Sequence, residues 1–321
     1  MPAPLVSVFI PTYNGAATLP QVLAALRNQK TDFPYEIVAI DSSSRDTTRE
    51  ILAEHQVRFE TIPSTQFNHG ATRNAGVALC HSEFVALMTQ DALPADDQFL
   101  QRLAEPLRRD PRIAGATARQ KPVASSTLLP KIDLHLWVAG SAVSSVRFRS
   151  HIVGYEQMSP MERRTLCNFD DIAGLIRKSV WQQHPYAPLN FAEDLQWGKT
   201  VFEAGYGLAH AAEAVVYHSH DRSFRYEFKR AFVTSEIHDR LFAIDDAVPL
   251  PRALGMGVLA PWNLARVYPP AANEPPAAIA RAAWIVLARG LGRWWYGQYR
   301  PLKHSQPGIA EQIRRACSSG V

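Results

Sequence analysis

The chain has 321 residues, a formal net charge of +4 and a hydrophobic fraction of 46%, which is the composition of an ordinary globular protein. Its three cysteines are far apart and form no C-x-x-C pattern, which indicates a reducing compartment and argues against a disulfide framework or a thiolate zinc site. No apolar stretch reaches the roughly 18 residues that a membrane-crossing helix needs, and the residues after Met1 lack the pattern of a signal peptide.

Charge is distributed unevenly along the chain. From Arg222 onward there are 14 Lys and Arg residues against 7 Asp and Glu residues, a net charge of +7, whereas the first 221 residues carry −3. A basic tail of this kind favours an anionic partner surface, either a membrane or a nucleic acid. We favour the membrane, because the tail contains no identifiable nucleic-acid recognition module.

The first part of the chain alternates between apolar runs typical of buried strands and segments with helical spacing of apolar residues. Strands are expected at 5–10, 35–40, 58–62 and 84–88, and helices at 19–26, 47–55, 71–79 and 99–108. Asp46 is the expected N-cap of the second helix. This alternation predicts right-handed βαβ units and an α/β fold with a mostly parallel sheet flanked by helices.

The second part of the chain is less regular. Further strands are expected at 113–118, 170–177 and 214–217, with a helix at 193–204. The segment 123–168 shows no clear period, and we interpret it as an irregular, substrate-facing insertion. A proline-rich linker is expected at 248–276. Beyond it, the aromatic and basic segment 279–299 predicts a helix that either lies at the water-lipid interface or packs on its own domain.

Three strand ends carry side chains that suit a phosphate or metal site. Asp41, Asp91 and His218 each follow an apolar run, and ligands of open α/β sheets bind outside the carboxyl ends of the strands. A carboxylate and an imidazole suit a divalent cation that carries a diphosphate. Asp194, in the first turn of a helix, is available as a general base. Each residue also has a simpler interpretation: Asp91 begins a turn, Asp194 caps a helix, and His218 is an ordinary edge residue.

Several motifs together resemble family 2 glycosyltransferases, which have the GT-A fold and invert the anomeric centre. They are residues 8–14 (VFIPTYN), 41–46 (DSSSRD), the Asp91 strand, Glu193-Asp194 and His218. The resemblance covers about residues 5 to 221. The strings 67–74 (FNHGATRN), 89–92 (TQDA), 119–122 (RQKP) and 218–220 (HSH) resemble the rhamnosyltransferase-like branch, which typically uses a dTDP-linked deoxysugar.

The resemblance implies a role for each matching position. Asp194 matches the catalytic base, and the catalytic role implied for Glu193 is to orient that base or to contact the acceptor. Asp91 and His218 match ligands of a Mg²⁺ or Mn²⁺ ion. The implied nucleotide-binding residues are Pro11, Thr12, Tyr13, Asn14, Asp41, Ser43, Arg73 and Asn74. The implied sugar-binding residues are Gln90, Arg119 and Gln120. The implied partners are a nucleotide-sugar donor and a saccharide or polyprenyl-diphosphate-linked acceptor.

The implied domain organisation is a transferase domain at 1–221 and a helical, basic, aromatic-rich region at 222–321 that could contact a membrane surface. The expected location is the cytoplasm or the inner face of the cytoplasmic membrane. One residue departs from the family pattern: Thr89 replaces the first aspartate of the D-x-D metal motif. We therefore expect only modest stimulation by a divalent cation.

Two other classes of function share part of this pattern. A nucleotide-dependent oxidoreductase would also contain βαβ units, but no G-x-G-x-x-G follows the first strand, and that motif is the usual mark of a dinucleotide site. A degenerate transferase domain that only binds nucleotide sugar or lipid is the second alternative, because Thr89 weakens the metal motif.

Overall fold

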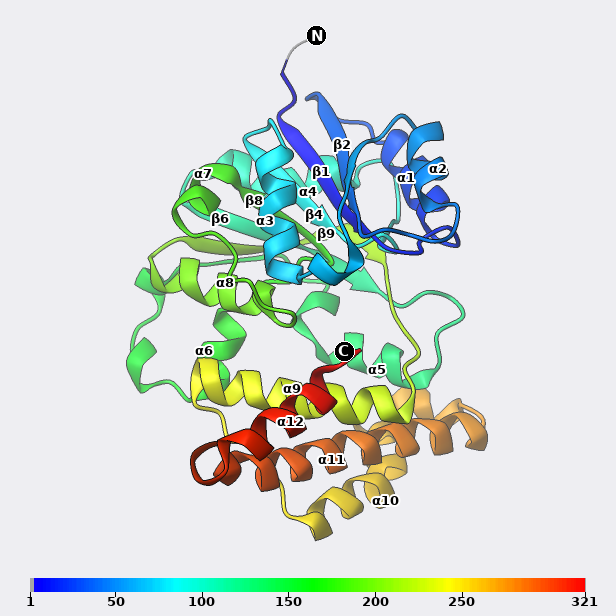
Figure 1. Cartoon of the computed structure of the whole chain (residues 1–321), viewed down its shortest axis with the longest axis vertical. Coiled ribbons are helices and arrows are strands. Elements are labelled where there is room, and N and C mark those ends of the chain that lie inside the picture. The colour runs from blue at the N-terminus through cyan, green and yellow to red at the C-terminus, as the bar shows by residue number, and fades with distance from the viewer. Residues whose placement is uncertain (1–2, 321) are drawn as a thin grey trace. The chain divides into compact units, whose positions relative to one another are not determined.

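The computed structural model describes residues 3–320 and separates into two compact units (Figure 1). Unit 1 holds the residues up to 123 together with 137–158 and 164–218, and unit 2 holds 124–136, 159–163 and the residues from 219 onward. Unit 2 therefore combines the C-terminal region with two segments from the middle of the chain. The division at residue 221 that the sequence predicts does not include those two segments.

Unit 1 contains a nine-stranded sheet with the order β3-β2-β1-β4-β8-β6-β9-β5, and β7 pairs with β9. The strands are β1 (Val6–Thr12), β2 (Tyr35–Asp41), β3 (Arg58–Thr61), β4 (Phe84–Met88), β5 (Leu93–Pro94), β6 (Ile113–Lys121), β7 (Ser145–Arg147), β8 (Ala173–Arg177) and β9 (Gly207–Tyr217). β1 to β4 are parallel, as are β6 and β9, whereas β8 runs antiparallel to both β4 and β6. The sheet is therefore mixed, with the parallel β1–β4 group that the sequence predicts.

Helices cover both faces of this sheet. They are α1 (Leu19–Arg27), α2 (Thr48–Glu54), α3 (His69–Leu79), α4 (Phe99–Arg109), α7 (Lys178–Gln183) and α8 (Glu193–Glu203), with short 3-10 turns at Ser64–Gln66, Val138–Gly140, Arg149–His151 and Tyr155–Gln157. Val8 and Ile10 of β1 join the core formed with α1 and α4. Phe9 points to the opposite face, where a β-carbon on Gly76 of α3 would lie 2.2 Å from its ring. Alternation along a buried strand thus fixes a helix layer on each side.

Three element boundaries differ from those that the local sequence signals predict. The N-cap position of α2 is Thr47 rather than Asp46, but Asp46 Oδ1 still accepts a hydrogen bond from the Thr48 amide at 3.1 Å. β1 continues through Pro11 to Thr12, two residues beyond the predicted end at Ile10. The expected strand at 214–217 is the end of the longer strand β9.

Unit 2 is helical and corrects two expectations. Its helices are α5 (Leu128–Leu136), α9 (Phe224–Phe242), α10 (Leu250–Val267), α11 (Pro276–Ser305) and α12 (Pro307–Ser318), with a 3-10 turn at Pro269–Asn273; α6 (Pro160–Leu166) crosses from unit 2 into unit 1. The segment 123–168 is therefore not uniformly irregular. The predicted proline-rich linker at 248–276 is wrong, because Leu250–Val267 is helical. Pro249 is the N-cap residue, Pro251 lies in the first turn, where the missing N–H has no helical partner to lose, and Pro261 is accommodated inside the helix.

The aromatic segment of α11 packs within unit 2. Tyr296 and Tyr299 are buried, and their hydroxyls donate to Asp239 of α9 at 2.5 Å and to Glu236 at 2.9 Å. Arg289 donates to Asp133 of α5 and to Glu227 of α9. These contacts hold α11 between α5 and α9. Among the described helices, none combines the length and the apolar composition that crossing a bilayer requires.

Candidate active site

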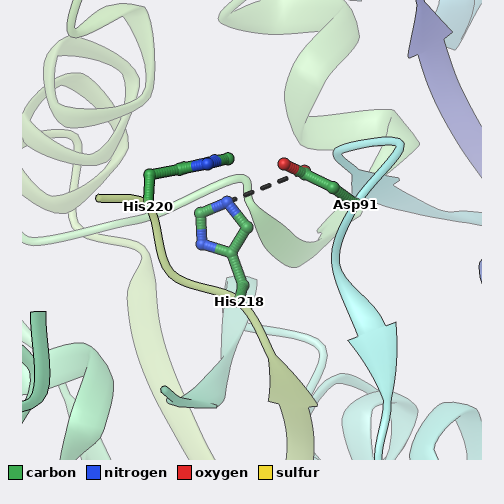
Figure 2. A group of neighbouring side chains, drawn as sticks. All are labelled: Asp91, His218 and His220. Atoms are coloured by element: carbon green, nitrogen blue, oxygen red, sulfur yellow. Dashed lines mark ion pairs between the residues drawn. The ribbon is translucent and has the colours of Figure 1, made fainter. Parts of the chain in front are cut away.

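Strand pairing brings Asp91 and His218 together. β5 pairs antiparallel with the end of β9, so that Leu93 lies opposite Tyr217; Asp91 precedes Leu93 by two residues, and His218 follows Tyr217 directly. The His218 Nε2 atom lies 3.7 Å from Asp91 Oδ1. Figure 2 shows the imidazole and the carboxylate pointing toward each other; His220, also drawn, lies two residues further along the chain, in unit 2. The predicted convergence of these two strand ends is present.

Gln120 orients the His218 ring. Its Oε1 atom lies 3.3 Å from His218 Nδ1, and its amide Nε2 donates to Asp170 Oδ2 at 2.8 Å. An Nδ1–H that donates to Gln120 leaves Nε2, the nitrogen that faces Asp91, with its lone pair available. A histidine metal ligand is commonly held by its other ring nitrogen in this way. These contacts favour an orienting role for Gln120 over the predicted contact with the sugar.

A buried arginine gathers the acidic residues near the predicted base. Arg73 Nη1 lies 2.7 Å from Glu193 Oε1, and Arg73 Nη2 donates to Asp171 Oδ1 at 2.8 Å. Arg73, Asp171 and Glu193 are all buried. Because the guanidinium is occupied by two carboxylates, the structure favours a role in positioning these acids over the predicted contact of Arg73 with the nucleotide.

Electrostatics in this group favour retention of a proton. Asp171 and Glu193 pair with the Arg73 guanidinium, Asp194 feels its charge, and burial penalises the charged form of all three carboxylates. Burial raises the pKa of Glu193 to about 7, against the opposing effect of Arg73. Burial likewise raises the pKa of Asp194 and of Asp171, again opposed by Arg73. A carboxylate whose pKa is raised by burial suits general base chemistry.

The start of α8 has a constrained backbone. Ala192, the N-cap residue, has a φ of 58° in the left-handed region, which non-glycine residues adopt at a cost and which is often found at functional sites. The Asp194 carboxylate then accepts a hydrogen bond from the Leu195 amide at 2.6 Å. This turn fixes the direction of the predicted base relative to the helix.

The loops after β1 and β2 form one hydrogen-bonded platform. Asp41, fully buried, accepts from the Thr12 hydroxyl at 3.1 Å and from the Ser44 amide at 2.9 Å. The Asn14 amide donates to Ser44 Oγ, and Asn14 Oδ1 accepts from the Arg45 amide. Asn14 and Ser43 both have positive φ angles. Thr12 and Asp41 therefore stabilise the two loops through these buried hydrogen bonds.

Gln90 joins the platform to the loop after β4. Its side chain accepts from the Tyr13 amide at 2.9 Å and donates to the Tyr13 carbonyl at 3.0 Å. A β-carbon on Gly15 would lie 2.5 Å from Gln90 Oε1, so a larger residue at position 15 would displace the Gln90 amide from this position. The Tyr13 side chain is left about half exposed, at 48%. These contacts favour a positioning role for Gln90, with Tyr13 presented to solvent.

Two further predicted residues make structural contacts. Asn74 Oδ1 accepts from the Trp181 indole at 2.8 Å and from the Tyr186 amide at 3.0 Å, so Asn74 holds the segment after α7. Arg119 donates from Nε to the Gly140 carbonyl at 3.2 Å. Arg119 and Asn74 are both half-buried. The predicted ligand contacts of both residues stay predictions.

The position of Thr89 bears on the metal site. Its hydroxyl oxygen is buried and makes no hydrogen bond with any of the described residues, which is uncommon for a buried polar atom. Asp91 and His218 offer one carboxylate and one imidazole, with Asp91 Oδ1 and His218 Nε2 3.7 Å apart. This set fits Mg²⁺ or Mn²⁺ in type, with fewer charged ligands than a D-x-D motif supplies.

A continuous chain of contacts joins the base group to the metal group. Asp171 contacts Arg73, the adjacent Asp170 accepts from Gln120, and Gln120 contacts His218. Sequence reasoning missed Asp170 and Asp171, which were expected only as the start of a strand. The available signal was two adjacent acidic residues directly before a buried strand. Two surface hollows of 520 and 690 Å³ among the described residues lie elsewhere and are lined by none of the predicted site residues.

Comparison with known proteins identifies the family to which the chain belongs. The model of glycosyl transferase family 2 matches residues 7–182. The chain is 31% identical over 237 residues to the O-antigen chain rhamnosyltransferase RfbN of Salmonella typhimurium. The aligned residues cover 73% of this chain and 72% of the relative. The O-antigen chain rhamnosyltransferase WbaN of Salmonella anatum is 30% identical over 239 residues, with the same coverage of 73% and 72%.

Solved structures share the fold at low identity. The mannosyltransferase PcManGT from Pyrobaculum calidifontis, solved with GDP-Man and Mn²⁺, has a TM-score of 0.54 and 17% identity, covering 99% of this chain and 86% of its own. Residues 1–349 of S. aureus TarS give a TM-score of 0.51 at 16% identity, with 92% of each chain covered. These likenesses confirm the expected GT-A fold. The chain belongs to glycosyl transferase family 2 and is a glycosyltransferase.

Proposed function

We propose that this enzyme transfers L-rhamnose from dTDP-rhamnose to a hydroxyl group of a growing surface polysaccharide, with inversion at the anomeric carbon. Both relatives named as rhamnosyltransferases are matched over 72% of their length, which supports this donor class. The observation that carries the transfer chemistry is the chain of contacts from Glu193 and Arg73 to Gln120 and His218. It joins an acidic group suited to proton removal with a pair of residues suited to holding a diphosphate through a cation.

In this proposal Asp194 is the general base. Its carboxylate takes the proton of the acceptor hydroxyl as the hydroxyl oxygen attacks the anomeric carbon. The new C–O bond forms on the face opposite the departing diphosphate, and the bond between the anomeric carbon and the phosphate oxygen breaks. The electron pair of that bond leaves with the diphosphate. One displacement of this kind inverts the configuration.

Other residues position the reactants. Glu193 and Asp171 are held by Arg73, so the acidic group keeps one geometry through the reaction. Asp91 and His218 would hold a Mg²⁺ or Mn²⁺ ion, which supplies neutralisation of the charge on a leaving diphosphate. Tyr13 and the backbone of residues 11–14 would contact the nucleoside, and Asp41, Ser43 and Thr12 would hold this loop in place. Arg119 remains the candidate for contact with the sugar.

The proposed acceptor is a saccharide carried on a polyprenyl diphosphate lipid. Such an acceptor would require the enzyme to work at the inner face of the cytoplasmic membrane. No observation favours the alternative of a non-catalytic domain that only binds nucleotide sugar.

A thermal-shift screen of nucleotide sugars tests the donor assignment. Because a ligand that binds only the folded state raises Tm by mass action, dTDP-rhamnose should raise Tm more than UDP-glucose or GDP-mannose, and Mn²⁺ should increase the shift modestly. Asp91→Asn should remove the Mn²⁺-dependent part while Glu213→Gln, at an exposed position on β9, should leave it unchanged. A larger response to another nucleotide sugar would contradict the donor assignment.

A further inference from the structure

Helix α10 of unit 2 is apolar on its inner face, which packs against α11. Ala253, Ala260 and Leu264 are buried. A β-carbon on Gly257 would lie 2.8 Å from the Leu287 side chain, and one on Gly290 of α11 would lie 2.8 Å from the Ala253 carbonyl. Small residues thus allow a close approach of the two helices, and this approach uses one face of α10.

The opposite face of α10 is also apolar, and it faces solvent. We define the α10 apolar face as Leu250, Leu254, Val258, Leu259 and Trp262, which recur mainly at four-residue spacing. Val258 is 79% exposed, Trp262 77%, Leu259 58% and Leu254 47%. A helix on the surface of a globular domain normally carries polar residues on its outer side. An exposed apolar strip of this length indicates an interaction surface.

Helix α9 of the same unit shows the ordinary pattern. The exposed positions of α9, all of whose residues are described, are Arg225, Arg230 and Arg240. Its buried positions include Phe232 and Val233. The apolar outer face is therefore a property of α10 and does not extend to every helix of unit 2.

The charged residues near the α10 apolar face indicate an anionic partner. Residues 250–267 contain no Asp or Glu, and their two charged residues, Arg252 and Arg266, are both exposed. On α11, Arg281 and Trp284 are exposed as well. Apolar residues that include Trp, flanked by arginine and free of acidic residues, match the boundary between acyl chains and anionic headgroups.

We propose that the α10 apolar face inserts into the interfacial layer of a membrane that contains anionic phospholipid. The helix would lie in the plane of the membrane, with Trp262 at headgroup level and Arg252 and Arg266 against lipid phosphates. This assignment moves the membrane contact from the segment 279–299, whose Tyr296 and Tyr299 are buried within unit 2, to residues 250–266. The proposal does not depend on which sugar the enzyme transfers.

The test is co-sedimentation of the full chain with vesicles of phosphatidylcholine, with and without phosphatidylglycerol at about one third of the lipid. The wild type should pellet with the anionic vesicles and much less with the neutral ones. Val258→Glu should weaken binding to anionic vesicles about tenfold or more, because it places a charge where acyl chains would lie. Val153→Glu, at a 98% exposed valine of unit 1, is the matched control and should bind like the wild type.

Charge reversal at Arg252 and Arg266 tests the electrostatic contribution to vesicle binding. This double variant should lose binding to anionic vesicles while keeping the weak binding to neutral ones. Circular dichroism and Tm should show that all variants fold. Equal binding by Val258→Glu and the wild type would overturn the proposal. It would also be overturned by a concentration-dependent dimer in size-exclusion chromatography with light scattering that Val258→Glu converts to a monomer, because the α10 apolar face would then be covered by a second copy of the chain.

Discussion

The two ends of the active-site contact chain are built differently. At the base end, Arg73 lies among Asp171, Glu193 and Asp194, and burial makes each charge depend on the others. At the metal end, Asp91 and His218 are 3.7 Å apart, and Thr89 replaces a second carboxylate. The difference teaches that buried charge fixes the geometry at the base end, whereas the Gln120 amide is among the contacts that orient His218 at the metal end. Substitutions at the base end should therefore cause large losses of activity or stability. Substitutions at the metal end should cause smaller losses that depend on the metal concentration.

The largest expected effect is at Asp194. Asp194→Asn removes the proton acceptor while keeping the shape of the side chain, so kcat should fall by about 10²–10⁴-fold. The affinity for the donor, measured by calorimetry, should stay near the wild-type value. Glu213→Gln, at an exposed site on β9, serves as the control and should keep full activity. Activity that persists in Asp194→Asn would show that another group is the base.

Arg73 should dominate the stability of the base end. Arg73→Met leaves Asp171 and Glu193 buried without their cation, and breaking a buried ion pair from one side typically costs about 3–5 kcal/mol. Urea denaturation would measure the free energy of unfolding. Adding Asp171→Asn to Arg73→Met should restore part of the loss, because it removes one uncompensated charge. A loss below about 1 kcal/mol would mean that Arg73 is not the element that holds the acids together.

Gln120 should control metal affinity rather than chemistry. Gln120→Leu removes the contact that orients His218, and loss of such an outer partner typically weakens metal binding by about 10–100-fold. Mn²⁺ titration followed by electron paramagnetic resonance would give the affinity directly. Activity should return at saturating Mn²⁺. If Mn²⁺ affinity stays unchanged but the KM for the donor rises, Gln120 contacts the sugar, as the sequence predicts.

The pH dependence should report the base end. The base must be ionised, and burial raises the pKa of Glu193 to about 7 and raises that of Asp194. Activity should therefore fall with decreasing pH above the ordinary carboxyl range near 4, because the pKa of the Asp194 base is raised. Glu193→Gln removes one of the two coupled protons and should move this fall to lower pH. A kcat/KM profile that is flat between about pH 5 and pH 8 would contradict the assignment.

The sequence predicts the strands, most helices and the meeting of Asp91 with His218, because these depend on local pattern and on the rule that ligands gather at strand ends. The pairing of Arg73 with Asp171 joins residues 98 positions apart, and no local pattern carries that information. The same holds for Gln120 and His218. The helix α10 was missed because prolines at 249, 251 and 261 read as linker, although proline is accepted in a first turn.

The most direct test of the account is the anomeric configuration of the product, determined by NMR after incubation of the enzyme with dTDP-rhamnose, Mn²⁺ and a saccharide acceptor. A single displacement assisted by Asp194 predicts a glycosidic bond whose configuration is opposite to that of the donor, and no such product from Asp194→Asn. A product that retains the donor configuration would contradict the account.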